Sequence, residues 1–287
     1  MALFNRRTTG SVVCPACGAL VGVKDTSCYV CGRVNPGLFG FGPLLRQLGA
    51  DFGFVPVVIG ASALLYICSL LLSGGSIFEI SGLFSILSPS VPALFVFGAS
   101  GGIPVFRFGR WWTVLSASWL HGSLLHIVFN MYYVRMFGPA AAELFGPART
   151  VIIYVIGGAT GFLLSSLAFA FVPRIPFLAG AGFTVGASAP IFGLLGAMVH
   201  YGHVGSSTVK QAALQYAIPL FLFGLVMPGV DNWAHAGGFV GGYLVSSVLK
   251  PMSRERGDHM IVALLCLAAT VVAIAVSVIS GLSLFLR

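Results

Sequence analysis

The sequence predicts an all-α, polytopic membrane protein with seven transmembrane helices and a small N-terminal zinc ribbon, and three observations support this prediction. Of the 287 residues, 57% are hydrophobic and only 8% are charged, whereas soluble domains carry about 25% charged residues. Seven apolar runs follow one another from residue 55 onward. Before them stand two Cys-x-x-Cys pairs, in a segment that has no apolar run of comparable length.

The N-terminal unit, residues 1–40, carries these pairs, and each ends in glycine ("CPACG" and "CYVCG"). The four cysteines are Cys14, Cys17, Cys28 and Cys31. Four thiolates at this spacing suit a tetrahedral Zn²⁺ ion. Two disulfides are the alternative, which a reducing cytosol disfavours. Because so small a unit has little core, metal binding would largely fold it. We predict a structural or partner-binding site, since four thiolates leave no open position for catalysis.

The membrane domain, residues 55–287, follows a Gly/Phe-rich linker over residues 41–54. Each apolar run predicts a helix that crosses the bilayer, because about 20 apolar residues span its core. The fourth run is shorter, and it predicts a helix that begins partway through the membrane. The runs cover residues 55–73, 119–137, 150–172, 188–203, 212–228, 231–249 and about 260–285.

The basic residues predict a cytoplasmic N-terminus, because Lys and Arg favour the cytoplasmic side of a membrane. Only four of the 15 basic residues then fall outside, namely Arg107, Arg110, Arg174 and Arg287. The net charge of +8 is thus interpreted as an orientation signal, and no nucleic-acid partner is expected. The first residues contain no apolar segment typical of a cleaved signal peptide. This favours a bacterial plasma (inner) membrane and leaves a eukaryotic membrane open.

The segment between the first two runs, residues 74–118, is apolar but contains three prolines and several glycines. It is too broken for a regular transmembrane helix. Two interpretations stay open. The segment lies in the outer leaflet, held by Trp111 and Trp112 at the interface, or it is an ordinary interfacial loop.

Polar residues within the apolar runs are candidates for function, because ionisable groups are costly inside a membrane. In the second run His126 and Asn130 are four residues apart and share one helix face, and His121 comes just before them. A single buried His or Asn usually joins two helices. Two such residues on one face strengthen the functional interpretation.

The fourth run begins "GASAPIFG". Pro190 suits the first turn of a helix, where its missing N–H is not needed, so the helix is predicted to begin at Ser188 or Ala189. The preceding "PFLAGAGFTVGA" is irregular, and irregular backbone at membrane depth lines a cavity or is buried in protein. We predict a water-accessible pocket at Ser188. A plain Ser–Pro helix entry is the alternative.

The sixth run begins "DNWAHAGGFVGGYL" and places His235 near its start. Gly238 and Gly242 are four residues apart, a spacing that lets helices approach closely. This would bring His235 within reach of Ser188. Asp231 either orients His235 or caps the helix, and its place at the water boundary favours the cap.

These residues together suit acyl transfer. Serine becomes a nucleophile when a base takes its proton, and histidine is a suitable base at neutral pH. The tetrahedral intermediate needs hydrogen-bond donors directed at its oxyanion. The backbone N–H of Ser188, with His126 and Asn130, are candidates for these donors.

The segments "HGSLLHIVFN", "GASAPIFG" and "AHAGGFVGG", in this order within residues 107–249, resemble the rhomboid family of intramembrane serine proteases. The resemblance implies a rhomboid-like bundle with Ser188 as nucleophile and His235 as base. It also implies four oxyanion or supporting residues: His126, Asn130, His121 and Phe192, the last an aromatic ring against His235.

Further matches and departures qualify this resemblance. "GRWW" is similar to the family's outer loop, with Arg110 and Trp111 in a looser register, and the seventh run resembles a six-plus-one arrangement. The usual G-x-S-G has Ala189 in place of its last glycine, which still leaves the backbone N–H free. We expect an active serine endopeptidase that cleaves transmembrane segments of membrane proteins through an acyl-enzyme, without a catalytic cofactor.

Two other function classes remain. One is a non-catalytic, rhomboid-like scaffold whose zinc ribbon recruits a cytosolic partner. The other is a channel or transporter, which the scarcity of charged residues within the runs disfavours. For the protease, the resemblance implies a substrate helix that unwinds into the site and has a small side chain at the cut.

Overall fold

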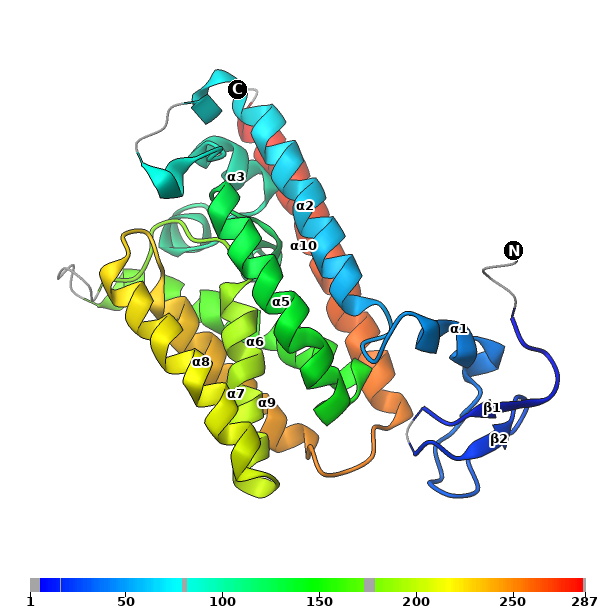
Figure 1. Ribbon diagram of the computed structural model, residues 1–287. Coiled ribbons are helices and arrows are strands. Elements are labelled where there is room, and N and C mark those ends of the chain that lie inside the picture. The colour runs from blue at the N-terminus through cyan, green and yellow to red at the C-terminus, as the bar shows by residue number, and fades with distance from the viewer. Residues whose placement is uncertain (1–5, 16, 79–81, 173–178, 286–287) are drawn as a thin grey trace.

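The computed structural model describes the whole chain except residues 1–5, 16, 79–81, 173–178 and 286–287. Arg174 and Arg287, which enter the orientation prediction, lie outside the described residues. A bundle of long helices carries a small two-stranded unit beside one of its ends (Figure 1). We call this end the ribbon end and the other the opposite end.

The two-stranded unit forms around the cysteines. Strand β1 (Ser11–Val13) pairs antiparallel with β2 (Leu20–Gly22), so that Val12 lies opposite Val21. These two valines are buried with Val23, Cys14 and Cys28, and few other apolar side chains of the described residues join them. The predicted linker contains structure as well, because the short helix α1 (Gly42–Gln47) lies within it.

Long helices match the seven apolar runs. They are α2 (Phe54–Ser73), α5 (Leu124–Phe145), α6 (Pro147–Phe171), α7 (Ser188–Val204), α8 (Ser207–Val226), α9 (Asn232–Leu249) and α10 (Gly257–Phe285). Within the described residues, α2, α6, α8 and α10 are long and apolar enough to cross a membrane. The chain is therefore an integral, multi-pass membrane protein, whereas the count of seven spans stays a prediction.

The predicted bounds of two runs were wrong because helix ends depend on capping and turn geometry as well as on hydropathy. The second run, expected at 119–137, becomes α5. The Ser123 hydroxyl accepts a hydrogen bond from the N–H of His126 and sets its start, and the helix continues through Pro139. The fifth run, expected at 212–228, becomes α8, which begins earlier with the polar residues 207–211.

The segment 74–118 contains only short helical pieces in its described part, in agreement with the sequence. These are η2 (Gly74–Phe78), η3 (Leu83–Ser85), α3 (Val91–Phe97), the π-helical turn η4 (Ile103–Arg107), α4 (Thr113–Ser116) and η5 (Ala117–Trp119). Its position relative to the membrane stays a prediction.

Arg110 joins this segment to α10 through hydrogen bonds. Its guanidinium donates to the carbonyl oxygens of Phe95 at 2.6 Å and of Ser277 at 2.7 Å, and lies 4.1 Å from the centre of the Phe95 ring. The indole N–H of Trp112 donates to the Ser277 hydroxyl at 3.0 Å. A buried arginine with such partners is a structural link, one that joins the first and last parts of the membrane domain.

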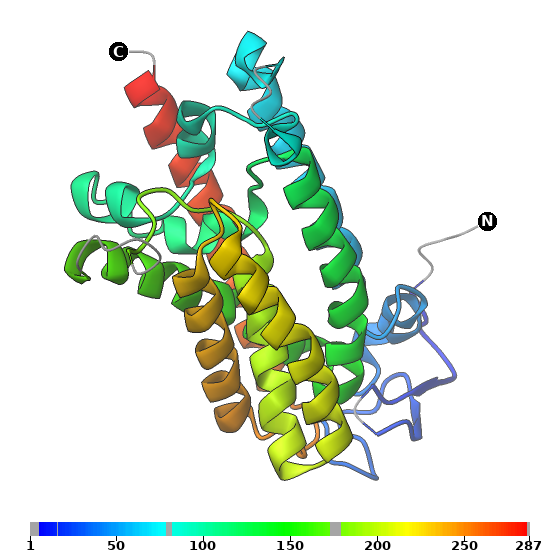
Figure 2. The same cartoon turned by 60° about the vertical axis from the view of Figure 1, so that its left-hand side comes forward.

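Glycines let α6, α7 and α9 meet at the centre of the bundle. A Cβ atom on Gly238 or Gly242 would overlap the carbonyl oxygen of Ala189 or Gly193 on α7. A Cβ on Gly237 would lie 2.8 Å from the Leu164 side chain on α6. The predicted close approach of the sixth run to the fourth is thus confirmed. In Figures 1 and 2, α7, α8 and α9 lie side by side.

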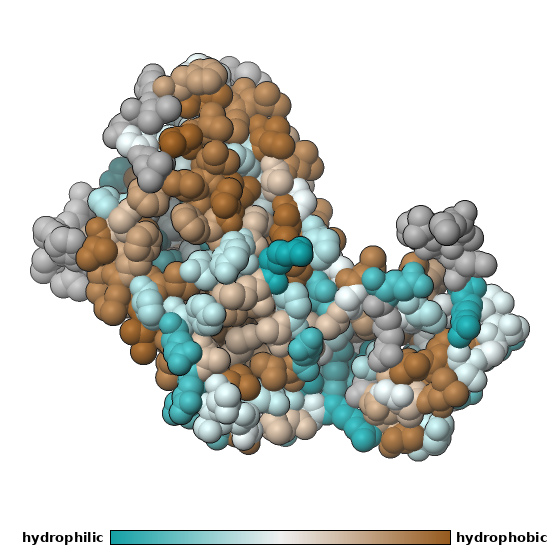
Figure 3. All heavy atoms as spheres, viewed as in Figure 1, coloured by the Kyte–Doolittle hydropathy of each residue, from teal (hydrophilic) through white to brown (hydrophobic). Residues whose placement is uncertain are grey.

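The bundle has an apolar outer surface. Brown residues cover much of it in Figure 3, while teal residues gather lower down and near the ribbon. Large apolar side chains such as Leu71 on α2 and Val248 on α9 are exposed. Such a surface suits contact with lipid, in keeping with the apolar helices.

Candidate active site

Ser188 is the first residue of α7 and is half-buried. Ala187 is the N-cap residue and Pro190 lies in the first turn, in agreement with the sequence. The first N–H groups of a helix have no partner within it. The N–H groups at the start of α7 are therefore candidate donors beside the Ser188 hydroxyl.

The loop before Ser188 is held by protein contacts. Its described residues 179–187 include Thr184, whose backbone pairs with Ser100 through bonds of 2.8 and 3.1 Å. Gly186 has a φ of 134°, a left-handed conformation that favours glycine, and its N–H donates to the carbonyl of Ala117. These contacts satisfy part of the irregular backbone, as the predicted position within the membrane would require.

His126 directs a donor at the space beside Ser188. The N–H of Gly122 donates to its Nδ1 at 3.2 Å, so the ring carries its own proton on Nε2. A Cβ atom placed on Gly186 would lie 2.6 Å from this Nε2 and 3.6 Å from the Ser188 Oγ. One position beside Gly186 thus lies near both the Nε2–H group and the hydroxyl, an arrangement that suits an oxyanion donor.

Asn130 and His121 lie behind His126. Asn130 is buried one turn further along α5, and its amide donates to the carbonyl of His126 at 2.9 Å. His121 is fully buried, accepts from the N–H of Ala187 at 3.5 Å, and meets the His126 ring edge-on. His121 therefore supports the backbone just before Ser188, whereas a direct role of Asn130 at the oxyanion stays a prediction.

His235 lies in the first turns of α9 and is 6% exposed. Its ring stacks on Phe192 of α7, with centroids 4.3 Å apart and planes at 15°. Phe192 is one turn after Ser188 on the same helix, so the stack holds the imidazole against the helix that carries the hydroxyl. The contact expected for Phe192 is therefore present. The Ser–His dyad itself stays a prediction.

Asp231 is the helix cap that the sequence favours. One carboxylate oxygen accepts from the N–H of Ala234 at 3.1 Å, and the other accepts from the Ser165 hydroxyl at 2.5 Å. The partner of His235 is instead Asn232, whose Oδ1 lies 3.3 Å from its Nδ1. The sequence reasoning missed Asn232, although its i, i+3 spacing from His235 was a signal.

A cavity of about 310 Å³ borders His235 and Phe192 between α7, α8 and α9. The other described residues that line it are apolar and come mainly from α8, including Leu214, Ile218 and Phe221. Ser188 is absent from this described lining. The water-accessible pocket predicted at Ser188 therefore stays a prediction.

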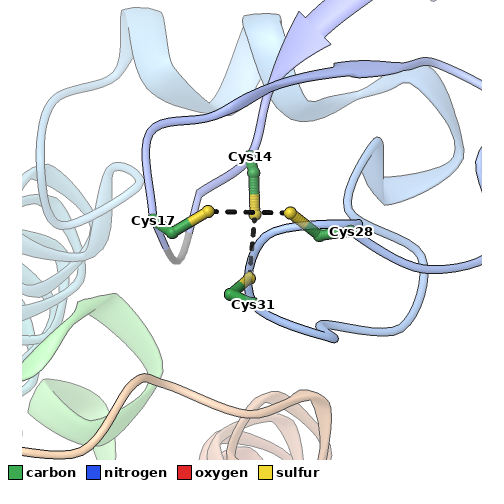
Figure 4. A group of neighbouring side chains, drawn as sticks. All are labelled: Cys14, Cys17, Cys28 and Cys31. Atoms are coloured by element: carbon green, nitrogen blue, oxygen red, sulfur yellow. Dashed lines mark hydrogen bonds between the residues drawn. The ribbon is translucent and has the colours of Figure 1, made fainter.

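The four N-terminal cysteines form a second cluster (Figure 4). Their sulfur atoms all lie within 4.8 Å of one another, with Cys14 and Cys31 at 3.7 Å and Cys17 and Cys28 at 3.6 Å. A tetrahedron with Zn–S bonds of about 2.3 Å has edges of about 3.8 Å. All six cysteines of the chain are described, and all are free thiols. The cluster therefore fits a metal ion better than two disulfides.

The thiols of this cluster titrate unequally. Burial tends to raise the pKa of Cys28, but hydrogen bonds from backbone N–H groups and neighbouring thiols outweigh it and lower the pKa to about 7. Burial raises the pKa of Cys31 to about 12. Sulfurs this close cannot all become thiolates without a compensating positive charge. A divalent cation at their centre would supply it.

Comparisons with known proteins agree with the geometry. A family model described as a rhomboid domain matches residues 108–252. RHOMBOID-like protein 7 of Arabidopsis thaliana is 33% identical over 57% of this chain, and the rhomboid protease GluP of Bacillus subtilis is 29% identical over 64%. The inactive RHOMBOID-like protein 8 of Arabidopsis thaliana is 31% identical over 60%.

The chain spans about half or less of the length of these relatives. The matches cover 51% of RHOMBOID-like protein 7, 35% of GluP and 48% of RHOMBOID-like protein 8. The rhomboid-domain match contains every residue of the candidate active site, from His121 to His235. The family match spans half of the chain. The chain therefore belongs to the rhomboid family.

Proposed function

We propose that the protein is an intramembrane serine protease with Ser188 as nucleophile and His235 as its base. One observation carries the proposal. The Ser188 hydroxyl at the start of α7 and the Nε2–H donor of His126 both lie within 3.6 Å of one point beside Gly186, while Phe192 on the same helix stacks against His235. The rhomboid protease GluP is a relative, which supports the same activity.

In the proposed reaction, the Ser188 Oγ attacks the carbonyl carbon of a peptide bond while His235 Nε2 takes its proton. The oxyanion accepts hydrogen bonds from the N–H of Ser188, from His126 and from Asn130. The C–N bond then breaks, and His235 returns the proton to the leaving amine, so that an acyl-enzyme remains. Water, deprotonated by His235, hydrolyses the ester and restores the serine hydroxyl.

The proposed substrate is a single transmembrane helix. Hydrogen bonds within a helix shield its peptide bonds, so the substrate must unwind before it reaches Ser188. The N-terminus and the ribbon end face the cytoplasm in this proposal, because the basic residues favour that side. The bacterial plasma (inner) membrane stays a prediction, since both plant and Bacillus proteins are relatives.

The test uses purified protein in proteoliposomes with a transmembrane substrate. Ser188→Ala is expected to abolish cleavage, whereas Ser166→Ala on α6, whose hydroxyl donates to the carbonyl of Phe162 on the same helix, keeps it. Unchanged cleavage by Ser188→Ala overturns the assignment. Quantitative membrane proteomics of cells with either variant then identifies substrates.

A non-catalytic, rhomboid-like scaffold is the second candidate, and the inactive RHOMBOID-like protein 8 among the relatives favours retaining it. A phosphonofluoridate probe separates the two. The protease predicts labelling of Ser188 that is lost in His235→Ala, because the hydroxyl reacts only when a base activates it. No labelling of the wild-type protein, in detergent and in lipid, supports the scaffold.

For the ribbon, we propose that the four cysteines hold one structural Zn²⁺ and that the unit binds a cytosolic partner. A zinc ion with four thiolate ligands has no open coordination position and serves as a structural ion. Exposed apolar side chains of Leu20, Tyr29 and Val34 support the partner role. The zinc content should fall from one ion per chain in the wild-type protein to near zero in Cys14→Ser. An equal zinc content in the two proteins would contradict the proposed metal site.

A further inference from the structure

The imidazole of His235 has a neutral hydrogen-bond partner that belongs neither to the proposed Ser–His dyad nor to the Asp231 helix cap. Asn232 Oδ1 faces His235 Nδ1 at 3.3 Å. Since an amide oxygen only accepts hydrogen bonds, the ring donates through Nδ1–H. This tautomer leaves the Nε2 lone pair free to accept a proton, as a base requires.

The surroundings of Asn232 hold its amide in this position. Asn232 is the first residue of α9, directly after the Asp231 cap, so it and His235 share one face of the first turn. A Cβ atom on Gly224 of α8 would overlap the Asn232 Oδ1. The amide oxygen therefore occupies space that only a glycine on α8 leaves open.

The ring of His235 is thus held in two independent ways. Phe192 stacks on its face and limits its tilt, while Asn232 bonds its edge and sets its tautomer and rotation. The titratable groups near it are His126 on α5 and Asp231 on α9. Asp231 is engaged by Ala234 and Ser165, and the described contacts that α7 and α8 make around His235 are apolar.

We propose that Asn232 is a positioning residue for the proposed base, a neutral third member beside Ser188 and His235. This inference rests on the proposed function. A neutral amide orients the imidazole without stabilising the imidazolium as strongly as a carboxylate would. The site therefore keeps its base unprotonated in a region where a buried charge is costly.

Kinetics of two variants test the proposal. Asn232→Ala is expected to lower kcat about 10- to 100-fold with little change in KM, because the base loses orientation while substrate binding does not. Asn232→Asp keeps an acceptor and adds a charge that favours imidazolium. It should recover most of the lost kcat and move the acidic limb of the kcat/KM profile to higher pH.

Ser246→Ala is the matched control. The Ser246 hydroxyl on α9 also bonds a histidine, at 2.9 Å from His200 Nδ1, away from the site. It should leave kcat and the pH profile unchanged. Wild-type kcat in Asn232→Ala, or an unmoved profile in Asn232→Asp, overturns the proposal even when the wild-type protein is an active protease.

¹⁵N NMR of labelled histidine provides a readout that does not depend on activity. The wild-type protein should show the Nδ1–H tautomer for His235, and Asn232→Ala should lose it. If Asn232→Ala does not fold, the spectrum of Gly224→Ala, whose new methyl displaces the amide, replaces it. The proposed function fails on a different result. In that case the wild-type protein shows no Ser188-dependent cleavage, while its spectrum still shows the Nδ1–H tautomer of His235.

Discussion

The ribbon and the helical bundle each bring polar side chains into a small volume, but they hold them by different means. Around the cysteines only a few apolar residues are buried, and four sulfurs lie within 4.8 Å. Around Ser188, helices meet at glycines, and the histidines are held by backbone and ring contacts. We therefore expect the order of the ribbon to depend on a bound metal ion and the order of the bundle to depend on close packing.

Metal removal gives the largest expected effect and separates the two regions. Zinc binding stabilises small four-ligand units by about 10–16 kcal/mol, so a strong chelator or Cys28→Ser should unfold residues 11–34. Amide hydrogen exchange there should become fast, while the melting temperature of the bundle changes little. Retained protection in metal-free protein would mean that packing alone holds the ribbon.

His126→Ala tests the donor next to Ser188. Loss of one oxyanion donor lowers kcat about 10²- to 10³-fold, and the melting temperature should fall much less than activity does. His200→Ala removes a histidine that bonds Ser246 elsewhere on the bundle and should retain kcat. Equal losses in the two variants would indicate that His126 acts only through stability.

Gly242→Val breaks the packing on which the bundle relies. The new side chain overlaps the carbonyl of Gly193 on α7, and overpacking of this kind costs about 1–3 kcal/mol. Thermal unfolding in detergent should show the loss, together with reduced cleavage because α9 carries His235. The matched control is Gly60→Val, at a glycine on α2 with no atom within 4 Å of its added Cβ. A comparable loss in the control would contradict the packing argument.

A buried ion pair joins the two regions. Arg33 of the ribbon lies 3.8 Å from a carboxylate oxygen of Glu255, and the other oxygen accepts from the N–H of Arg149 at the start of α6. The Arg254 guanidinium donates to the carbonyl of Val30 at 3.3 Å. The ribbon therefore docks on the segment between α9 and α10.

The docking should depend weakly on pH, the smallest of these effects. Burial raises the pKa of Glu255 above its ordinary value, and the Arg149 N–H and the Arg33 charge only partly offset this. The docked form thus binds the proton more tightly, so docking is strongest at low pH and weakens as the pH rises through the raised pKa.

The measurement is limited proteolysis of the ribbon between about pH 5 and about pH 8. Wild-type cleavage should rise with pH relative to Glu255→Gln, whose side chain stays neutral. Both proteins share the four-cysteine cluster, so its own pH dependence cancels. Parallel profiles would show that Glu255 does not control docking.

Much of both regions could be predicted from sequence because the signals are local. The spacing of the cysteines predicted the four-sulfur cluster, and Pro190 predicted the start of α7 at Ser188. The glycine spacing after His235 predicted the contact of α9 with α7. In each case residues a few positions apart share one turn or one helix face, so the chain's own geometry places them together.

Other features were decided only by the tertiary structure. Hydropathy misplaced both ends of α5, because the Ser123 cap and a helix that continues past Pro139 set them. The links between Arg110 and Ser277 and between Arg33 and Glu255 join residues far apart in sequence. The partner of His235 is Asn232 because the Asp231 carboxylate caps the start of α9 and Gly224 on α8 leaves space for the Asn232 amide. Such pairings require the packed bundle, since only the relative placement of separate helices determines which buried polar groups can meet.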